Sequence, residues 1–253
     1  MGIDPLAAEG FTKGADAYRR ARPGYAAAAV TALVDRLEIG PGKRVVDLAA
    51  GTGKLTAQLV DTGARLFAIE PVANMRSHLA SDLPTVRAIG GAAERIPLAD
   101  ASIDVVVVAQ AFHWFATPVA LGEIRRILRP GGGFALVWNV RVRAGWAGEL
   151  AAMVDAYGYA MVGFETERWL KAFDGDTGFT PLERSEFPNA QDVDVEQVLQ
   201  RVASTSFIAT LPDSERERLA ARVRDLVATH PETHGRDRFR MGHVTRIYCC
   251  NRS

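Results

Sequence analysis

The hydrophobic pattern of the first two-thirds of the chain alternates between short apolar runs and longer segments with helical periodicity. The clearest run extends over residues 103–108 and contains four consecutive valines, from Val105 to Val108. Because these apolar positions do not alternate with polar ones, the pattern indicates a strand that is buried on both faces. Such strands are typical of parallel sheets that helices cover on both sides.

Four further strands and four helices are predicted around this run. The strands are expected at residues 44–48, 65–70, 85–89 and 134–138. The helices are expected at residues 25–37, 54–61, 72–83 and 118–128. Glycine and proline clusters at 40–42 and 130–133 end the first and the last of these helices. The alternation of strand and helix predicts an α/β fold with a doubly wound, mostly parallel sheet and right-handed crossovers.

The last third of the chain has a different, mostly helical pattern. Helices are expected at residues 145–158, 166–173, 195–203 and 213–229, with strands near 181–187 and 243–250 and a polar loop over 233–240. Asp213 or Ser214 is expected to cap the helix over 213–229. We interpret residues 145–235 as a helical C-terminal cover over the sheet. The chain is therefore predicted to be a single domain over 1–253, with a core of about 25–140 plus the last strands.

A glycine-rich turn after the first predicted strand carries the main functional signal. It reads Asp47-Leu48-Ala49-Ala50-Gly51-Thr52-Gly53 and leads into a predicted helix. Glycines there allow a sharp turn and a close approach of the backbone to a ligand. Glu70 ends the next strand, about 20 residues on, where an acid can accept hydrogen bonds from both hydroxyls of a ribose. Loop and acid together indicate an adenosine-containing ligand, and the alternative is a tight turn beside a surface glutamate.

Spacing tests two phosphate-containing ligands for this turn. The dinucleotide fingerprint needs a third glycine where this chain has Thr56. A phosphate-binding P-loop needs a glycine where Leu48 stands and a serine or threonine where Leu55 stands. Both motifs fail, so a ligand without phosphates is favoured.

Composition narrows the partners of the protein. Of 253 residues, 48% are hydrophobic, and the 30 basic and 30 acidic residues give a formal net charge of zero. A neutral chain without a basic stripe has no electrostatic preference for nucleic acid or an anionic membrane, so neither partner is expected. The two adjacent cysteines and the spacing of the histidines suggest no disulfide framework and no metal site. No apolar run is long enough to span a membrane and no signal peptide is evident, so a cytoplasmic location is expected.

Several further motifs follow the glycine-rich turn in a fixed order. With that turn, they are Tyr18-Arg19-Arg20-Ala21-Arg22-Pro23-Gly24-Tyr25, Glu70-Pro71-Val72-Ala73-Asn74-Met75, Gly91-Ala92-Ala93-Glu94, Gln110-Ala111-Phe112-His113-Trp114-Phe115, Leu128-Arg129-Pro130-Gly131-Gly132 and Trp138-Asn139. In these motifs the chain resembles class I methyltransferases that depend on S-adenosylmethionine (SAM), and within them the small-molecule group that includes trans-aconitate methyltransferase. The resemblance implies a Rossmann-like, seven-stranded sheet whose last strand is antiparallel.

The resemblance also implies contacts to SAM. The residues it assigns to the cofactor are Tyr18, Arg22, Asp47, Ala49, Gly51, Gly53, Glu70, Met75, Ala93, Glu94 and Gln110. The loop would lie against the methionine part, Glu70 would hold the ribose, and Gln110 would approach the amino-acid end. Met75, Ala93 and Glu94 would surround the adenine, although Met75 could instead be a core side chain and Glu94 a solvated acid at a helix start.

Two loop residues have alternative interpretations. Asp47 would brace the loop by accepting backbone N–H bonds, or it would act as a simple turn cap. Ala49 occupies the first glycine position of the loop, where its methyl group could crowd the methionine end of SAM. We expect this position to need a small residue rather than a positive φ angle, and therefore to tolerate alanine.

The resemblance places the methyl acceptor beside aromatic and titratable residues. Tyr18, Arg22 and Tyr25 belong to an N-terminal segment that closes over SAM in this kind of enzyme, with Tyr25 facing the substrate. Trp114 would line the cleft, unless it packs in the core. His113 is the candidate general base, with a structural histidine as the alternative.

The predicted reaction is transfer of a methyl group from SAM to a small molecule, through a carboxylate or hydroxyl oxygen, with no metal. A carboxylate acceptor needs no strong base, because SAM already carries an activated leaving group. The alternatives are a SAM-binding regulatory module without catalysis, a nicotinamide-dependent oxidoreductase, and a nucleic-acid or protein methyltransferase.

Overall fold

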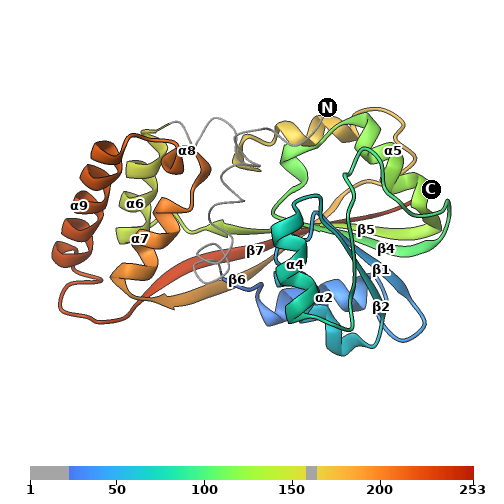
Figure 1. The fold of residues 1–253 in the computed structure, drawn as a ribbon, viewed down its shortest axis with the longest axis horizontal. Helices are drawn as coiled ribbons and strands as arrows, with labels where there is room; N and C mark the ends of the chain where they lie inside the picture. The colour runs from blue at the N-terminus through green and yellow to red at the C-terminus, as the bar shows by residue number, and fades with distance from the viewer. Residues whose placement is uncertain (1–22, 158–163) are drawn as a thin grey trace.

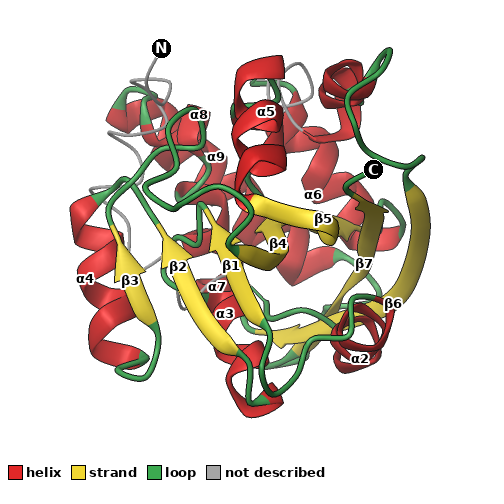
Figure 2. Ribbon diagram, turned by 90° about the vertical axis from the view of Figure 1, so that its right-hand side faces the viewer, coloured by secondary structure: helices red, strands yellow, loops and turns green. Residues whose placement is uncertain are grey.

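A seven-stranded sheet forms the centre of the molecule in a computed structural model that describes residues 23–157 and 164–253. The strand order is β3-β2-β1-β4-β5-β7-β6, and β7 runs antiparallel to both of its neighbours, β5 and β6, whereas the other pairs are parallel (Figure 2). The strands are β1 (Arg44–Leu48), β2 (Arg65–Ile69), β3 (Arg87–Ile89), β4 (Ile103–Ala109), β5 (Leu128–Arg141), β6 (Glu183–Val193) and β7 (Phe239–Asn251). This arrangement confirms the predicted α/β fold and the antiparallel last strand.

Helices cover the two faces of the sheet. One face packs against α2 (Ala27–Arg36), α3 (Lys54–Leu59) and α4 (Ala73–Asp82), and the other against α5 (Pro118–Ile127) and the 3-10 helices η4 (Phe164–Thr166) and η5 (Arg168–Phe173). Strand β4 shows why its valines are uninterrupted. Val106 and Val108 belong to the core on the α5 side, and Val105 and Val107 belong to the core on the α2 side. Both faces of β4 are therefore buried, as the pattern predicted.

The parallel strands place their carboxyl ends along one edge of the sheet. Residues 45–47 of β1 pair in register with 105–107 of β4, and 105–109 of β4 pair with 133–137 of β5. The loops that follow β1, β2, β4 and β5 therefore start side by side. In open α/β sheets this edge is where ligands bind.

The C-terminal helices form a lobe with its own apolar core. They are α6 (Gly145–Asp155), α7 (Val195–Ala203), α8 (Ser206–Ala209) and α9 (Asp213–Thr229), and they gather at the far end of the long β6 and β7 strands (Figure 1). Their core includes Trp146, Val198 and Val223, together with Phe239 from the start of β7. Figure 1 shows this C-terminal lobe beyond the end of the strands instead of spread over a face of the sheet, so it extends the sheet more than it covers it.

Several predicted element boundaries are wrong. Strand β5 begins at Leu128 and includes the glycine-rich run that was expected to be a turn; Leu128 pairs with Ile103, and Gly133 pairs with Val105 and Asn251. The helical stretch expected over 166–173 is a 3-10 helix at residues 168–173. Helix α9 starts directly after Pro212 without a side-chain cap, and Asp213 instead pairs with Arg216 one turn on. Across the described ranges, every helix is too short or too polar to traverse a bilayer.

Candidate functional site

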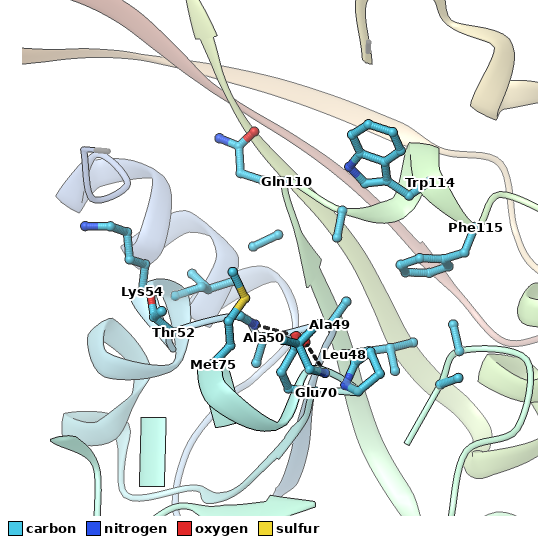
Figure 3. Close-up of a pocket in the computed structure, with 18 of the residues that line it drawn as sticks. Leu48, Ala49, Ala50, Thr52, Lys54, Glu70, Met75, Gln110, Trp114 and Phe115 are labelled. Carbon is cyan, nitrogen blue, oxygen red and sulfur yellow. Dashed lines mark hydrogen bonds between the residues drawn. The ribbon is translucent and has the colours of Figure 1, made fainter. Parts of the chain in front are cut away.

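A cleft opens at the carboxyl ends of the parallel strands (Figure 3). Its floor is the loop after β1, and its walls come from the segments after β2, β3, β4 and β5 and from α7. Of the residues assigned from the sequence, it brings together Tyr25, Ala49, Gly51, Glu70, Met75, Ala93, Glu94, Gln110 and Trp114. Gly53 lies at the start of α3, directly behind the loop. Tyr18 and Arg22 fall outside the described residues, so their predicted contacts stay predictions.

The loop after β1 is built from left-handed backbone. Ala49 has a φ of 57°, Gly51 of 59° and Gly53 of 81°. A side chain at Gly51 would contact only the Met75 sulfur, at 3.9 Å, whereas one at Gly53 would come within 3.0 Å of Leu79 and Leu83. Gly53 is thus required by close packing of α3 on α4, and Gly51 lines the open cleft. The glycines leave the backbone of the loop accessible from the cleft.

The expectation for Ala49 is wrong in one respect. Its φ lies in the left-handed region, so this position does require positive φ and not merely a small side chain. An L-residue in that conformation is strained by roughly 1–2 kcal/mol, because its Cβ crowds the following carbonyl. The loop therefore carries backbone strain at the bottom of the cleft, which is where binding sites commonly hold it.

Glu70 holds the loop in place from the neighbouring strand. Its carboxylate accepts backbone hydrogen bonds from Gly51 at 2.9 Å and from Val72 at 2.8 Å, as the dashed lines in Figure 3 show. Only 4% of the residue is exposed, and burial raises the pKa of its carboxyl above the ordinary value. Each carboxylate oxygen has a second lone pair, so Glu70 can accept bonds from a ligand while it braces Gly51.

Asp47 acts on the helix behind the loop. Its Oδ2 accepts a hydrogen bond from the Thr56 hydroxyl at 2.5 Å, and the backbone N–H of Thr56 also donates to it. Asp47 thereby caps the first turn of α3. The loop itself is braced by Glu70, which accepts the hydrogen bond from the Gly51 N–H. Burial raises the pKa of Asp47 to about 7. Thr56, whose presence argued against a dinucleotide site, is the residue that keeps this buried carboxylate hydrogen-bonded.

Two segments form the wall next to Glu70. Met75, at the start of α4, is 4% exposed and turns its sulfur toward the loop (Figure 3). Ala93 is 7% exposed, and Glu94 beside it is half-buried. This wall combines the polarisable apolar side chain of Met75 with backbone groups and one carboxylate, which suits the face and the polar edge of a purine ring.

The opposite wall is aromatic and polar. Gln110 follows β4 with a φ of 61°, and its backbone N–H donates to the Val137 carbonyl of β5 at 2.8 Å. Trp114 and Phe115 follow on the next turn, and 36% of Trp114 is exposed (Figure 3). Trp114 therefore lines the cleft and is not a core side chain. Tyr25, 7% exposed, reaches the cleft from the segment before α2.

His113 is not among the residues that line the cleft, although its neighbours are. It lies in the short 3-10 helix η2 (Phe112–Trp114), with its ring 4.9 Å from that of Trp114. Burial lowers the pKa of His113 to about 4, and its Nδ1 is buried with no hydrogen-bond partner among the described residues. A histidine with this pKa is a weak proton acceptor at neutral pH, so the geometry gives little support to its predicted role as a base.

A polar network fixes the chain just before α2. Asn139 at the end of β5 donates to the Gly24 carbonyl at 3.0 Å, and accepts from the Thr245 hydroxyl at 2.6 Å and from Asn189 at 3.1 Å. Thr245 also accepts from the backbone N–H of Ala26 at 3.0 Å. Three sheet strands thus hold the segment that carries Tyr25 against the cleft.

Arg201 is the cleft residue that the sequence analysis missed. It comes from α7 in the C-terminal lobe, is 4% exposed, and lines the cleft. A signal for it was present in the sequence, because Arg201 lies three residues after Val198 and next to Val202, on the apolar stripe of an amphipathic helix. An arginine on such a stripe is buried, and it therefore needs polar surroundings.

Residues that could bind a metal do not gather anywhere in the described part of the chain, which contains no group of three or more histidine, cysteine or acidic side chains. The two cysteines, Cys249 and Cys250, are buried free thiols in β7.

Comparison with known proteins finds methyltransferases in each search. A family model described as a methyltransferase domain matches residues 46–136, from β1 through β5. An uncharacterized methyltransferase of Mycobacterium tuberculosis is 37% identical over 236 residues, which are 93% of this chain and 92% of that protein. An uncharacterized methyltransferase-like protein of Schizosaccharomyces pombe is 31% identical over 91% of each chain.

Solved structures of methyltransferases share the fold. One from an antibiotic biosynthesis pathway of Anabaena variabilis matches with a TM-score of 0.65 at 21% identity, over 87% of this chain and 95% of that one. Similarity at this level of identity is evidence for the fold alone. The match with the mycobacterial relative, in contrast, extends over nearly the whole of both chains, the C-terminal lobe included.

Proposed function

The chain belongs to the methyltransferase family, with the Rossmann-like class I fold, and we propose that it transfers the methyl group of SAM to a small acidic molecule. The observation that carries this proposal is the pairing of Glu70 with the loop after β1. The backbone of this loop has positive φ angles, and the Gly51 N–H donates a hydrogen bond to the buried Glu70 carboxylate. The overall resemblance to the group of trans-aconitate methyltransferase supports a small-molecule acceptor.

The residues on the loop side of the cleft fit SAM. Gly51 leaves space for the methionine part, and Glu70 has lone pairs for two ribose hydroxyls. Met75 and the backbone around Ala93 suit the adenine. When bound, SAM supplies a methyl group on a sulfonium that is already an activated leaving group. The protein has to bind and orient it and to keep water away.

The space beside the cofactor suits a second ligand. The lining of the cleft continues past the residues that are proposed to hold SAM. Trp114 and Tyr25 line this second part, next to Gln110, which is proposed to approach the amino-acid end of SAM. The aromatic surfaces of Trp114 and Tyr25 exclude water from the reacting atoms.

The acceptor is proposed to be a carboxylate because of the side chains that surround it. The described residues of this part of the cleft include no histidine and no carboxylate that could act as a base, and His113 is not among the residues that line the cleft. A neutral hydroxyl would need such a base, whereas a carboxylate is already ionised at neutral pH. O-methylation of a small acid thus requires only what the cleft provides.

Two measurements test this function. Calorimetry with SAM, S-adenosylhomocysteine and NADH should give binding for the first two and none for NADH, and the reverse result would favour the oxidoreductase alternative. Incubation with radiolabelled SAM and a set of small carboxylic acids should then give labelled methyl esters that are sensitive to alkali. Binding without any transfer would favour a regulatory module, and label in added RNA or protein would point to a macromolecular acceptor.

A further inference from the structure

We propose that Arg201 binds an anionic group of the methyl acceptor, and that His243 holds the Arg201 guanidinium in the orientation for this contact. The inference rests on the proposed function, because that function places a second small molecule in the cleft. It assigns the recognition of the acceptor to a residue of the C-terminal lobe.

The local sequence explains how Arg201 reaches the cleft. Asp194 and Gln197 form a reciprocal capping box that fixes the start of α7, with bonds of 2.8 and 3.1 Å. From that start, Val198, Arg201 and Val202 fall on the same buried face of the helix. The two valines pack in the core of the lobe, and Arg201 extends between them and the sheet toward the cleft.

Residues of β6 and β7 hold the guanidinium from the sheet side. Nη2 of Arg201 lies 2.7 Å from Nε2 of His243, and Nη1 lies 3.4 Å from the Gln191 amide oxygen and 3.2 Å from the Met241 sulfur. Nδ1 of His243 lies 3.1 Å from the Met241 carbonyl, a contact in which only a protonated Nδ1 can donate. That assignment leaves Nε2 as the acceptor for Arg201, so His243 is neutral and fixes one side of the guanidinium.

Strand register places Arg201 across the cleft from the loop after β1. Asn139, itself a cleft residue, pairs with Thr245 of β7, and His243 is two residues further along the same face. Strands β1 and β7 are three positions apart in the sheet, a separation of about 14 Å. The loop and Arg201 therefore lie on opposite sides of the space that Gln110 and Trp114 line.

The charges of the cleft are divided in the same way. Among the described lining residues, the carboxylates Glu70 and Glu94 and the cation Lys54 belong to the segments around the proposed cofactor site. On the far side, the described lining residues are neutral except Arg201. Arginine stays protonated at all physiological pH values and presents its N–H groups in a fork that matches a carboxylate. A guanidinium that can contact a carboxylate therefore lies on the side of the cleft opposite Glu70 and Glu94.

The experiment uses the full chain saturated with S-adenosylhomocysteine and measures thermal shift and calorimetric affinity for succinate, glutarate and tricarballylate. Glutaramide, which has the shape of glutarate without charge, is the neutral probe. We expect at least one of the acids to bind and glutaramide not to bind. Arg201→Gln should weaken the acid at least tenfold, Arg201→Lys should weaken it less, and both should keep the affinity for S-adenosylhomocysteine within twofold.

Matched variants separate binding from stability. Arg222→Gln removes an exposed arginine of α9 in the same lobe and should change neither affinity. Arg201→Met keeps the length and the apolar stem, so it serves if the glutamine variant does not fold. His243→Gln retains an acceptor for Arg201 and should restore most of the acid affinity that His243→Leu loses.

The outcomes are distinguishable. Equal acid affinity in the wild type and in a folded Arg201 variant would overturn the proposal, and so would a wild type that binds S-adenosylhomocysteine but none of the acids. Absence of binding to S-adenosylhomocysteine itself would instead contradict the proposed function.

Discussion

The two sides of the cleft are built from different parts of the chain. The side proposed for the cofactor is centred on one local unit, β1, the loop, α3 and β2, in which Asp47, Gly51 and Glu70 lie within 24 residues of sequence, and the segments after β2 and β3 add Met75 and Ala93. The side proposed for the acceptor combines Tyr25, Trp114, Asn139 and Arg201, which no local segment contains.

The two sides also present different chemistry. The loop side exposes backbone and is held by buried carboxylates, so it recognises a ligand through shape and main-chain groups. The Arg201 side instead presents a buried arginine, whose guanidinium contacts residues of β6 and β7. In this proposal the cofactor is bound mainly by the backbone of one loop, which the local sequence specifies. The acceptor is selected by side chains that come together only in the folded chain.

The largest expected effect comes from destabilising the C-terminal lobe, which carries Arg201, and it tests whether the two sides of the cleft are independent. Trp146 is 2% exposed, packs edge-to-face on Phe239 at 4.9 Å between ring centroids, and donates to the Arg240 carbonyl. Trp146→Ala should cost about 3–5 kcal/mol in the free energy of urea unfolding. Affinity for S-adenosylhomocysteine should stay within twofold, because the loop side has a separate core.

The control for the tryptophan variant is Trp114→Ala. Trp114 is 36% exposed, so its loss should cost less than about 1 kcal/mol in stability while methyl transfer falls. If Trp146→Ala weakens S-adenosylhomocysteine in parallel with stability, the two sides are one cooperative unit and the comparison fails.

A second test uses the pH dependence of stability to examine the buried carboxyl group of Asp47 on the loop side. The pKa of Asp47 is about 7 in the folded chain and about 3.9 when unfolded, so between pH 4 and 7 the folded state binds the extra proton. Stability from this group is therefore complete at low pH and is lost as the pH rises through 7. Asp47→Asn lacks this dependence, so its stability relative to the wild type should improve by on the order of 3 kcal/mol from pH 4 to pH 8.

Urea unfolding at several pH values measures this difference. The variant Asp225→Asn, at an exposed position of α9, controls for the loss of one charge. A constant difference between Asp47→Asn and the wild type across the pH range would mean that the proton of Asp47 does not follow folding.

A third test concerns the carboxylate that joins the loop to β2. Glu70→Ala removes the acceptor for Gly51 and Val72 and the proposed partner of the ribose, so the affinity for SAM should fall more than tenfold, which is about 1.4 kcal/mol. Glu70→Gln keeps one acceptor oxygen and should lie between the alanine variant and the wild type. Calorimetry that finds unchanged affinity in the alanine variant would remove the ribose assignment.

The smallest expected effect comes from the strained residue of the loop. Ala49→Gly should relieve the left-handed strain and raise the free energy of unfolding by about 0.5–1 kcal/mol, net of the entropy that glycine adds to the unfolded chain. Ala50→Gly, at the next position and outside the residues of positive φ, should instead lower stability by about 0.4–1 kcal/mol. Equal changes at both positions would show that backbone strain at Ala49 is not what distinguishes them.

Sequence patterns predicted the local half of this molecule well. Strands β1, β2 and β4, and the helices between them, lie within one or two residues of the expected bounds, because buried valines and glycine turns determine them from neighbouring residues alone. The same reasoning missed the extension of β5 back to Leu128, since Leu128 pairs with Ile103 of β4 and the Gly131 N–H donates to the Arg252 carbonyl just past β7. It also left open whether Asp47 braces the loop or caps a turn, and it did not predict that the Gly51 N–H donates to Glu70.

The sequence by itself determined the α/β fold, the glycine-rich loop and the acid that follows it, because each depends on the spacing of residues within one strand–turn–helix unit. Only the tertiary structure decided that Ala49 is left-handed, that His113 is set back from the cleft, and that Arg201 lines it. The positions of Arg201 and of the segment before α2 involve contacts between residues 42 and 219 positions apart, Arg201 with His243 and Ala26 with Thr245. Spacing along a chain carries no information about such contacts, because they exist only after the sheet has paired and the lobe has packed.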